Sequence, residues 1–82
     1  MDIKEKIRDA FFQVAETTEA ELVIDQLCDN TVLLETGLNS LGFAVLVVTL
    51  EDELGFDPFP MLEEAVYPRT FGEFVEVYKK FA

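Results

Sequence analysis

Residues 40 to 54 read as a helix with apolar side chains on two opposite faces, and this pattern constrains the fold more than any other feature. At 100° per residue, one face collects five apolar side chains: Phe43, Leu46, Val47, Leu50 and Leu54. The opposite face collects four and then ends in carboxylates: Leu41, Ala44, Val45 and Val48, followed by Glu51 and Asp52. The first face predicts contact with a core. The second face has two interpretations, a helix buried on all sides or an exposed surface on which a partner docks.

The start of this helix is marked by two polar residues, Asn39 and Ser40. Either side chain can accept a hydrogen bond from a free amide of the first turn, so the sequence does not choose between them as the N-cap. Gly37 provides backbone freedom for a tight turn before the helix, and Gly55 is a plausible stop after it. A helix between these limits has about four turns and is roughly 20 Å long.

The segment that leads into this helix resembles a known signature. Residues 33 to 43, Leu-Leu-Glu-Thr-Gly-Leu-Asn-Ser-Leu-Gly-Phe, are similar to the attachment site of acyl carrier and peptidyl carrier proteins, and the likeness extends through residues 50 to 56. Those proteins are four-helix domains that hold a 4′-phosphopantetheine arm on the serine of an Asp-Ser-Leu motif. The resemblance implies that Ser40 is the attachment residue. This chain differs from the motif at Asn39, where the family usually has aspartate.

The resemblance implies an all-α fold, a four-helix bundle of the acyl-carrier-protein type formed by one domain over residues 1–82. The helix order and lengths read from the sequence fit this fold. A long loop, Thr17 to Asn39, would join helices 1 and 2, and a short third helix would occupy Met61 to Val66, before Pro68.

The terminal helices are predicted from capping residues and from side-chain periodicity. Asp2 is a candidate N-cap with Glu5 at the reciprocal position, and Thr70 has Glu73 at the same spacing. One apolar face then predicts a helix from residue 3 to about 16: Ile3, Ile7, Ala10, Phe11 and Val14. A wide, largely aromatic face predicts the last helix and its contact with the core: Phe71, Phe74, Val75, Tyr78 and Phe81.

The long loop contains two further predictions. Thr18 and Glu21 repeat the capping-box spacing before Leu22, Val23, Ile24 and Leu27, which indicates a short helix. The apolar run Val32, Leu33 and Leu34 is expected to enter the core. A connection of this length is often functional, and here it would deliver Ser40 to the surface.

The charge distribution limits the kinds of partner. The formal net charge is −11, and the six cations lie near the two ends of the chain: Lys4, Lys6, Arg8, Arg69, Lys79 and Lys80. From Asp9 through Pro68 there are thirteen carboxylates and no basic residue. Such a field repels nucleic acid and anionic lipid and attracts partners with basic patches, although acidity also serves solubility alone. With no long apolar run and no hydrophobic leader, we expect a cytoplasmic monomer without a membrane span.

Self-contained catalysis is not expected. The chain has no histidine and one cysteine, so neither Ser40 nor Cys28 has an imidazole base, and a cysteine-rich metal site is excluded. Ser40 is therefore either modified by another protein or only a cap. A final acidic cluster, Glu51, Asp52, Glu53 and Asp57, lacks the pattern of a calcium loop and is interpreted as solvated surface, with weak binding of Mg²⁺ or Ca²⁺ left open.

The resemblance implies a free-standing acyl carrier protein and no enzyme. A phosphopantetheinyl transferase would esterify Ser40, and the thiol of the arm would present acyl groups as thioesters to partner enzymes, as in fatty acid biosynthesis. The residues expected to meet such partners are Asn39, Leu41, Ala44, Val45, Val48, Glu51 and Asp52. The strong acidity favours an acyl cargo. An aminoacyl or peptidyl carrier of a secondary-metabolite pathway, and an unmodified interaction module of the same fold, remain alternatives.

Overall fold

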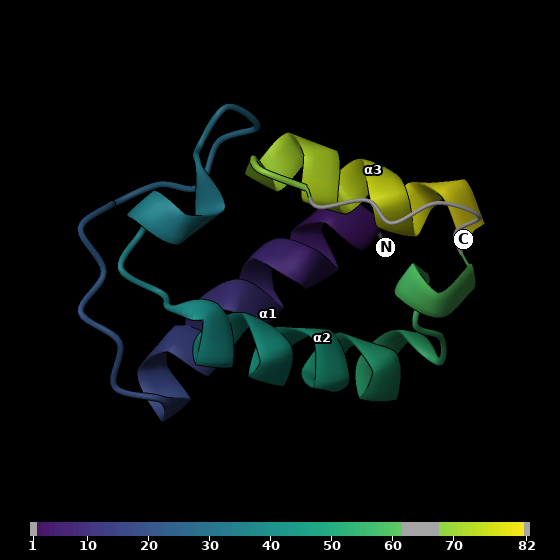
Figure 1. Ribbon diagram of the computed structural model, residues 1–82, viewed down its shortest axis with the longest axis horizontal. Coiled ribbons are helices and arrows are strands. Elements are labelled where there is room, and N and C mark those ends of the chain that lie inside the picture. The colour runs from purple at the N-terminus through teal and green to yellow at the C-terminus, as the bar shows by residue number, and fades with distance from the viewer. Residues whose placement is uncertain (1, 62–67, 82) are drawn as a thin grey trace.

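The structure is a computed structural model, which describes residues 2–61 and 68–81. Those residues form three α-helices, α1 (Ile3–Thr17), α2 (Ser40–Leu54) and α3 (Phe71–Phe81), together with two 3-10 turns, Leu33–Glu35 and Phe59–Met61. Helix α1 packs against both α2 and α3, and Figure 1 shows it crossing between them. The described part of the chain contains no strand and only one isolated β-bridge, between Val32 and Thr70. The all-α prediction is confirmed at this level.

Capping residues fix the ends of the helices as predicted. Asp2 accepts a hydrogen bond from the amide of Lys4 at 3.1 Å and begins α1. Thr70 and Glu73 form the reciprocal pair at the start of α3, since the Glu73 amide donates to Thr70 Oγ1 at 3.2 Å and the Glu73 carboxylate accepts from the Thr70 amide at 3.4 Å. Gly55 ends α2 in the left-handed conformation, with φ of 86°. These are local interactions, which is why sequence spacing could locate them.

The core is built from the predicted faces of all three helices. Its fully buried members include Ile7 and Phe11 of α1, Leu50 of α2, and Phe71 and Tyr78 of α3. Aromatic rings join the helices: the centroids of Phe11 in α1 and Phe43 in α2 lie 6.3 Å apart, and those of Phe43 and Phe74 in α3 lie 6.4 Å apart. One apolar face from each helix therefore closes a single hydrophobic cluster.

The predicted short helix after Thr18 is wrong. Thr18 ends α1, because its hydroxyl and its amide both donate to the Val14 carbonyl, at 2.8 and 2.9 Å. The chain then turns through Glu19, whose φ is 56°, and continues without helix. The Val23 amide donates across the loop to the Thr36 carbonyl at 2.8 Å instead of to a helical neighbour. The capping-box spacing was therefore a coincidence of polar residues at a helix end.

The expectation that Val32, Leu33 and Leu34 all enter the core is partly wrong. Leu33 is buried and Val32 is half-buried, but Leu34 is 68% exposed. The 3-10 turn Leu33–Glu35 explains the difference, because a tight turn directs consecutive side chains away from each other.

The predicted short helix from Met61 to Val66 falls almost entirely outside the described residues. Met61 itself ends the turn Phe59–Met61, in which its amide donates to the Pro58 carbonyl at 3.0 Å. Among the helices that are described, none combines the length and the apolar character needed to cross a bilayer.

Candidate functional site

Ser40 is the first residue of α2, and its side chain is exposed. Of the two possible caps, Asn39 is the one used: its Oδ1 accepts from the Gly42 amide at 2.9 Å, and its carbonyl accepts from the Phe43 amide at 3.0 Å. Because Asn39 caps the helix, the Ser40 hydroxyl is not needed for that purpose. The amides of Ser40 and Leu41 point along the start of the helix and have no partner within it.

The approach to Ser40 depends on a close chain crossing at Gly37. Its φ is 105°, and a Cβ built at this position would lie 2.1 Å from the carbonyl oxygen of Glu21. Only glycine fits there, since both the backbone conformation and the contact exclude a side chain. The early loop, near Glu21, therefore lies directly against the segment that precedes Ser40.

Leu38 packs against the first turn of α2. Its side chain is buried, and a Cβ added to Gly42 would lie 2.4 Å from Leu38 Cδ1. The missing side chain at Gly42 thus makes room for Leu38 against the helix. Ser40 is two residues from this anchor on one side and two from Gly42 on the other, so its position follows from packing rather than from its own contacts.

The loop before Ser40 is also tied to the start of α3 by backbone hydrogen bonds. The Leu33 amide donates to the Arg69 carbonyl, and the Phe71 amide donates to the Thr31 carbonyl, both at 2.9 Å. These two bonds flank the isolated bridge between Val32 and Thr70. Residues far apart in the sequence are thereby joined, and the loop is fastened although it contains no α-helix.

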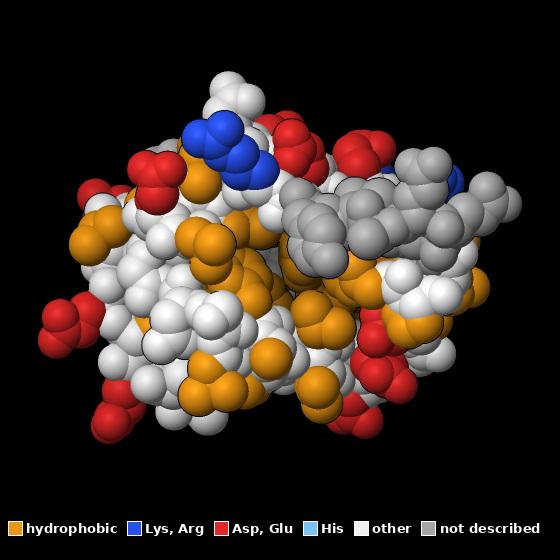
Figure 2. All heavy atoms as spheres, viewed as in Figure 1, with side chains coloured by type: hydrophobic (Ala, Val, Ile, Leu, Met, Phe, Trp, Pro, Cys, Tyr) orange, Lys and Arg blue, Asp and Glu red, His pale blue; other side chains and the backbone are white. Residues whose placement is uncertain are grey.

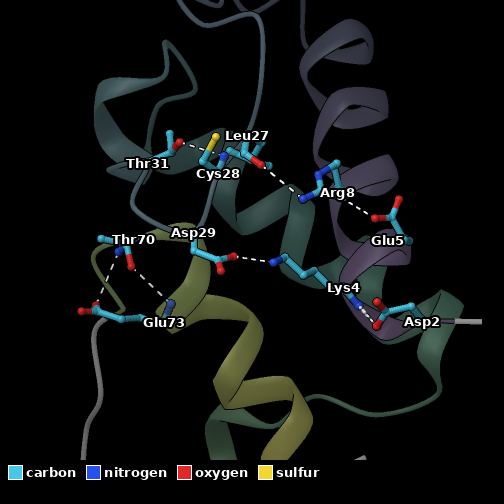
Figure 3. A network of polar contacts seen from close by, with 10 residues as sticks. All are labelled: Asp2, Lys4, Glu5, Arg8, Leu27, Cys28, Asp29, Thr31, Thr70 and Glu73. Atoms are coloured by element: carbon cyan, nitrogen blue, oxygen red, sulfur yellow. Dashed lines mark hydrogen bonds and ion pairs between the residues drawn. The ribbon is translucent and has the colours of Figure 1, made fainter.

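Asp29 adds a side-chain tie between the loop and α1, as Figure 3 shows. Its carboxylate pairs with the Lys4 ammonium at 2.6 Å, and its carbonyl accepts from the Gly72 amide at 2.9 Å. The hydrogen bond from Lys4 favours the charged carboxylate and holds the pKa of Asp29 below its ordinary value. Nearby, the Arg8 guanidinium lies over the Phe71 ring, 5.5 Å from its centroid.

The outer face of α2 is apolar and open, so the helix is not buried on all sides. Leu41 is 72% exposed and Val48 is 66% exposed, and Ala44 between them is also exposed. Val45 differs from the expectation, because it is half-buried and packs against the core. In Figure 2, apolar side chains lie along the region of α2 and carboxylates gather towards its C-terminal end.

The carboxylates at that end are Glu51, Asp52 and Glu53, all of them exposed. Glu51 and Asp52 continue the open apolar face, so that this surface runs along α2 with Ser40 at one end and negative charge at the other. Glu53 lies towards α1, beside Lys6 and Asp9. Within residues 2–61 and 68–81, no three acidic or cysteine side chains come close enough together to hold a metal ion.

Cys28 lies apart from this surface. It is exposed, and it lines an open groove of about 490 Å³ together with Lys4, Arg8 and Asp25. A neighbouring groove of about 590 Å³ is lined by side chains of both signs, among them Glu73 and Lys79. Neither groove includes Ser40.

Two features of the site were not predicted. Thr36, a polar residue in a loop, is fully buried, and Leu34 is exposed. A threonine beside a glycine gives no periodic signal of burial, and the direction of Leu34 depends on a turn that an apolar run does not reveal.

Comparison of the chain with models of protein families, with curated proteins and with solved structures found no match in any of the three. The side chains around Ser40 and along α2 are therefore the basis on which a function is assigned.

Proposed function

We propose that this chain is a carrier domain, and that a phosphopantetheinyl transferase attaches 4′-phosphopantetheine to Ser40. The observation that carries the proposal is the exposed serine at the first position of α2, left free because Asn39 supplies the cap. With no histidine in the chain, the base that takes the serine proton belongs to the transferase. The Ser40 oxygen forms an ester with the pantetheine-bearing phosphorus of coenzyme A, whose pyrophosphate bond breaks to release adenosine 3′,5′-bisphosphate.

The start of α2 suits the phosphodiester that this reaction leaves behind. The amides of Ser40 and Leu41 are free of helical partners, and the helix dipole favours negative charge at this end. No acidic residue occupies the first turn of α2. When bound, the arm would supply a terminal thiol that carries an acyl group as a thioester.

The exposed side of α2 would provide the docking surface for the transferase and for the enzymes that load and process the cargo. Leu41, Ala44 and Val48 offer apolar contact, and Glu51 and Asp52 orient a partner with a basic patch. Val45 contributes less than its place in the sequence suggested, because it is half-buried. Asn39, next to Ser40, is exposed and meets the same partners.

The proposal includes the four-helix arrangement of acyl carrier proteins, whose short third helix corresponds to Met61–Val66. Backbone chemical shifts of these residues would test that part directly. For the cargo, we propose an acyl group, since the net charge of −11 is typical of acyl carriers. Aminoacyl and peptidyl carriers use the same attachment chemistry, and loading assays with each class of enzyme separate them.

The deciding experiment is the intact mass of the protein after incubation with coenzyme A and a broad-specificity phosphopantetheinyl transferase. We expect a gain of one phosphopantetheine in the wild type and none in Ser40→Ala, with unchanged helix content. Thr49→Ala is the matched control, because it removes a hydroxyl from the same helix, one that donates to the Val45 carbonyl. A gain that persists in Ser40→Ala would move the site elsewhere. No gain with several transferases would favour an unmodified module that uses the same face.

A further inference from the structure

Thr36 is a polar residue of the loop that is completely buried, with 0% of its surface exposed. Its hydroxyl donates to the Leu33 carbonyl at 2.7 Å and accepts from the Leu38 amide at 3.2 Å. Its own carbonyl accepts from the Val23 amide at 2.8 Å. One residue thus joins three parts of the loop. Both hydrogen bonds of its hydroxyl are buried, where such bonds are costly to break.

These bonds connect the start of α3 with the start of α2. Leu33, which accepts from the Thr36 hydroxyl, donates its amide to the Arg69 carbonyl at 2.9 Å. Leu38, which donates to that hydroxyl, directly precedes the cap Asn39 and packs against the first turn of α2. The path therefore runs from Arg69 through Leu33 and Thr36 to Leu38, and it ends two residues before Ser40.

We propose that Thr36 is a positioning residue, whose hydroxyl fixes the direction in which Ser40 leaves the loop. This inference rests on the proposed function, since it concerns how Ser40 meets the transferase. Ser40 is exposed and lies two residues beyond the last buried anchor, Leu38. Its oxygen reaches the reacting phosphorus in a single geometry only if residues 36 to 38 are held. A small displacement of a reacting atom slows a group transfer strongly without weakening binding.

The docking surface should not depend on Thr36. Leu41 and Val48 lie on the outer face of α2, whereas Thr36 is inside the loop. Loss of the hydroxyl should therefore lower kcat of modification and leave KM nearly unchanged. A residue that merely fills the core would instead change the fraction of folded protein, which lowers the amount of substrate without changing kcat per folded molecule.

The test compares Thr36→Val, which keeps the shape and removes both side-chain hydrogen bonds, with Thr36→Ser, which keeps both bonds. For Thr36→Val we expect kcat of phosphopantetheine transfer to fall about ten-fold, with KM within about two-fold of wild type. Thr36→Ser should keep kcat within about two-fold of wild type. An unchanged kcat in Thr36→Val, or an equal loss in Thr36→Ser, would overturn the proposal, because the hydroxyl would then not be the cause.

Amide hydrogen exchange gives a second readout that needs no transferase. The amides of Leu38 and Gly42, which are hydrogen-bonded in the wild type, should exchange faster in Thr36→Val, while that of Phe11 in the core of α1 stays protected. If the wild type is not modified, the proposed function fails, yet exchange still decides whether Thr36 orders the approach to Ser40. Global unfolding of both Thr36→Val and Thr36→Ala would assign the hydroxyl to overall stability and would overturn the positioning role.

Discussion

The two faces of α2 both carry apolar side chains, but their surroundings are opposite. On the inner face, Leu46 and Leu50 are 1% and 0% exposed, whereas Leu41 and Val48 on the outer face remain mostly in water. The inner face meets α1 and the hydrophobic cluster, and no described element covers the outer one. An apolar residue in the sequence therefore indicates a side chain that favours burial. Whether that side chain is buried depends on the neighbouring helices.

The outer face is costly for a protein of this size. Burying a leucine or valine side chain contributes about 1.5–3 kcal/mol to the free energy of unfolding. Each exposed one leaves out this contribution. Two such residues on one side of a helix, beside exposed carboxylates, are the pattern expected of a surface that a partner covers. The inner face should thus control stability, and the outer face should control binding.

Leu50→Asp should have the largest effect, because it places a carboxylate at a fully buried position. An unpaired buried charge costs several kcal/mol, which is comparable with the roughly 5–10 kcal/mol that stabilises a small domain. We expect loss of helical circular dichroism and of the cooperative thermal transition. Leu50→Met is the control and should cost less than about 1.5 kcal/mol, since it conserves volume. A folded Leu50→Asp protein would show that the inner face is not the core that the structure describes.

Val48→Asp makes a similar change on the outer face and should leave the fold intact. The melting temperature should stay within roughly 4 °C of wild type, as expected for an exposed site. Modification by the transferase should slow about ten-fold in kcat/KM, the equivalent of about 1.4 kcal/mol. Val23→Asp is the matched control, because Val23 is equally open, at 76% exposed, but lies on the loop. Equal losses in the two variants would mean that binding is not confined to α2.

Tyr78→Phe tests how completely the hydrophobic core excludes water. Tyr78 is fully buried beside Phe74, and its hydroxyl has no hydrogen-bond partner among the described residues. Removing such a hydroxyl should raise the free energy of unfolding by about 1 kcal/mol in urea titrations at neutral pH. A decrease of similar size would indicate that the hydroxyl has a partner.

The same tyrosine predicts a response to alkaline pH. Burial, and next the carboxylates of Asp57 and Glu51, raise the pKa of Tyr78 above its ordinary value of about 10. The unfolded chain therefore loses this proton at lower pH than the folded chain does. The stability linked to Tyr78 is fully present below about pH 10 and is lost as the pH rises above it. Thermal scans between pH 8 and 11 should show a smaller decline in Tyr78→Phe than in wild type.

Much of the fold was predictable because its signals are local. The face Ile7, Phe11 and Val14, the capping pair of Thr70 and Glu73, and the stop at Gly55 each depend on residues within a few positions, and all are confirmed. Ser40 was placed at the start of its helix for the same reason.

The failures have two causes: local hydrogen bonds and turns that residue spacing does not reveal, and contacts between residues far apart in the sequence. Thr18 ended a helix instead of starting one because its hydroxyl and amide donate back to Val14, and Leu34 was exposed by a turn.

Val45 was assigned to the outer face by angle alone, but the core reaches far enough around α2 to cover part of it. The role of Thr36 depends on Val23 and Leu33, whose positions relative to it are set only in the folded chain. Periodicity indicates on which side of a helix a residue lies. It does not indicate how far the neighbouring elements extend around that helix, and so which of its side chains they bury.

The smallest expected effect concerns Asn39, the N-cap of α2. Asn39→Asp keeps the oxygen that accepts from the Gly42 amide and adds a charge next to Ser40. Stability should hardly change, because both residues cap well and a carboxylate suits a helix N-terminus. If a transferase reads this position with a basic side chain, the new ion pair is partly exposed and is worth at most about 1 kcal/mol.

The rate of modification should therefore rise only about two- to five-fold in Asn39→Asp, and the gain should shrink as salt is added, since exposed charges are screened. Initial rates at low and high ionic strength with a general-purpose transferase measure both effects. Asn39→Ala separates charge from capping, because it removes the oxygen that accepts from Gly42 and should lower stability by about 1 kcal/mol. Equal rates for the wild type and Asn39→Asp at low salt would mean that the transferase does not read charge here, and that the contacts which guide it lie farther along the outer face, towards Glu51 and Asp52.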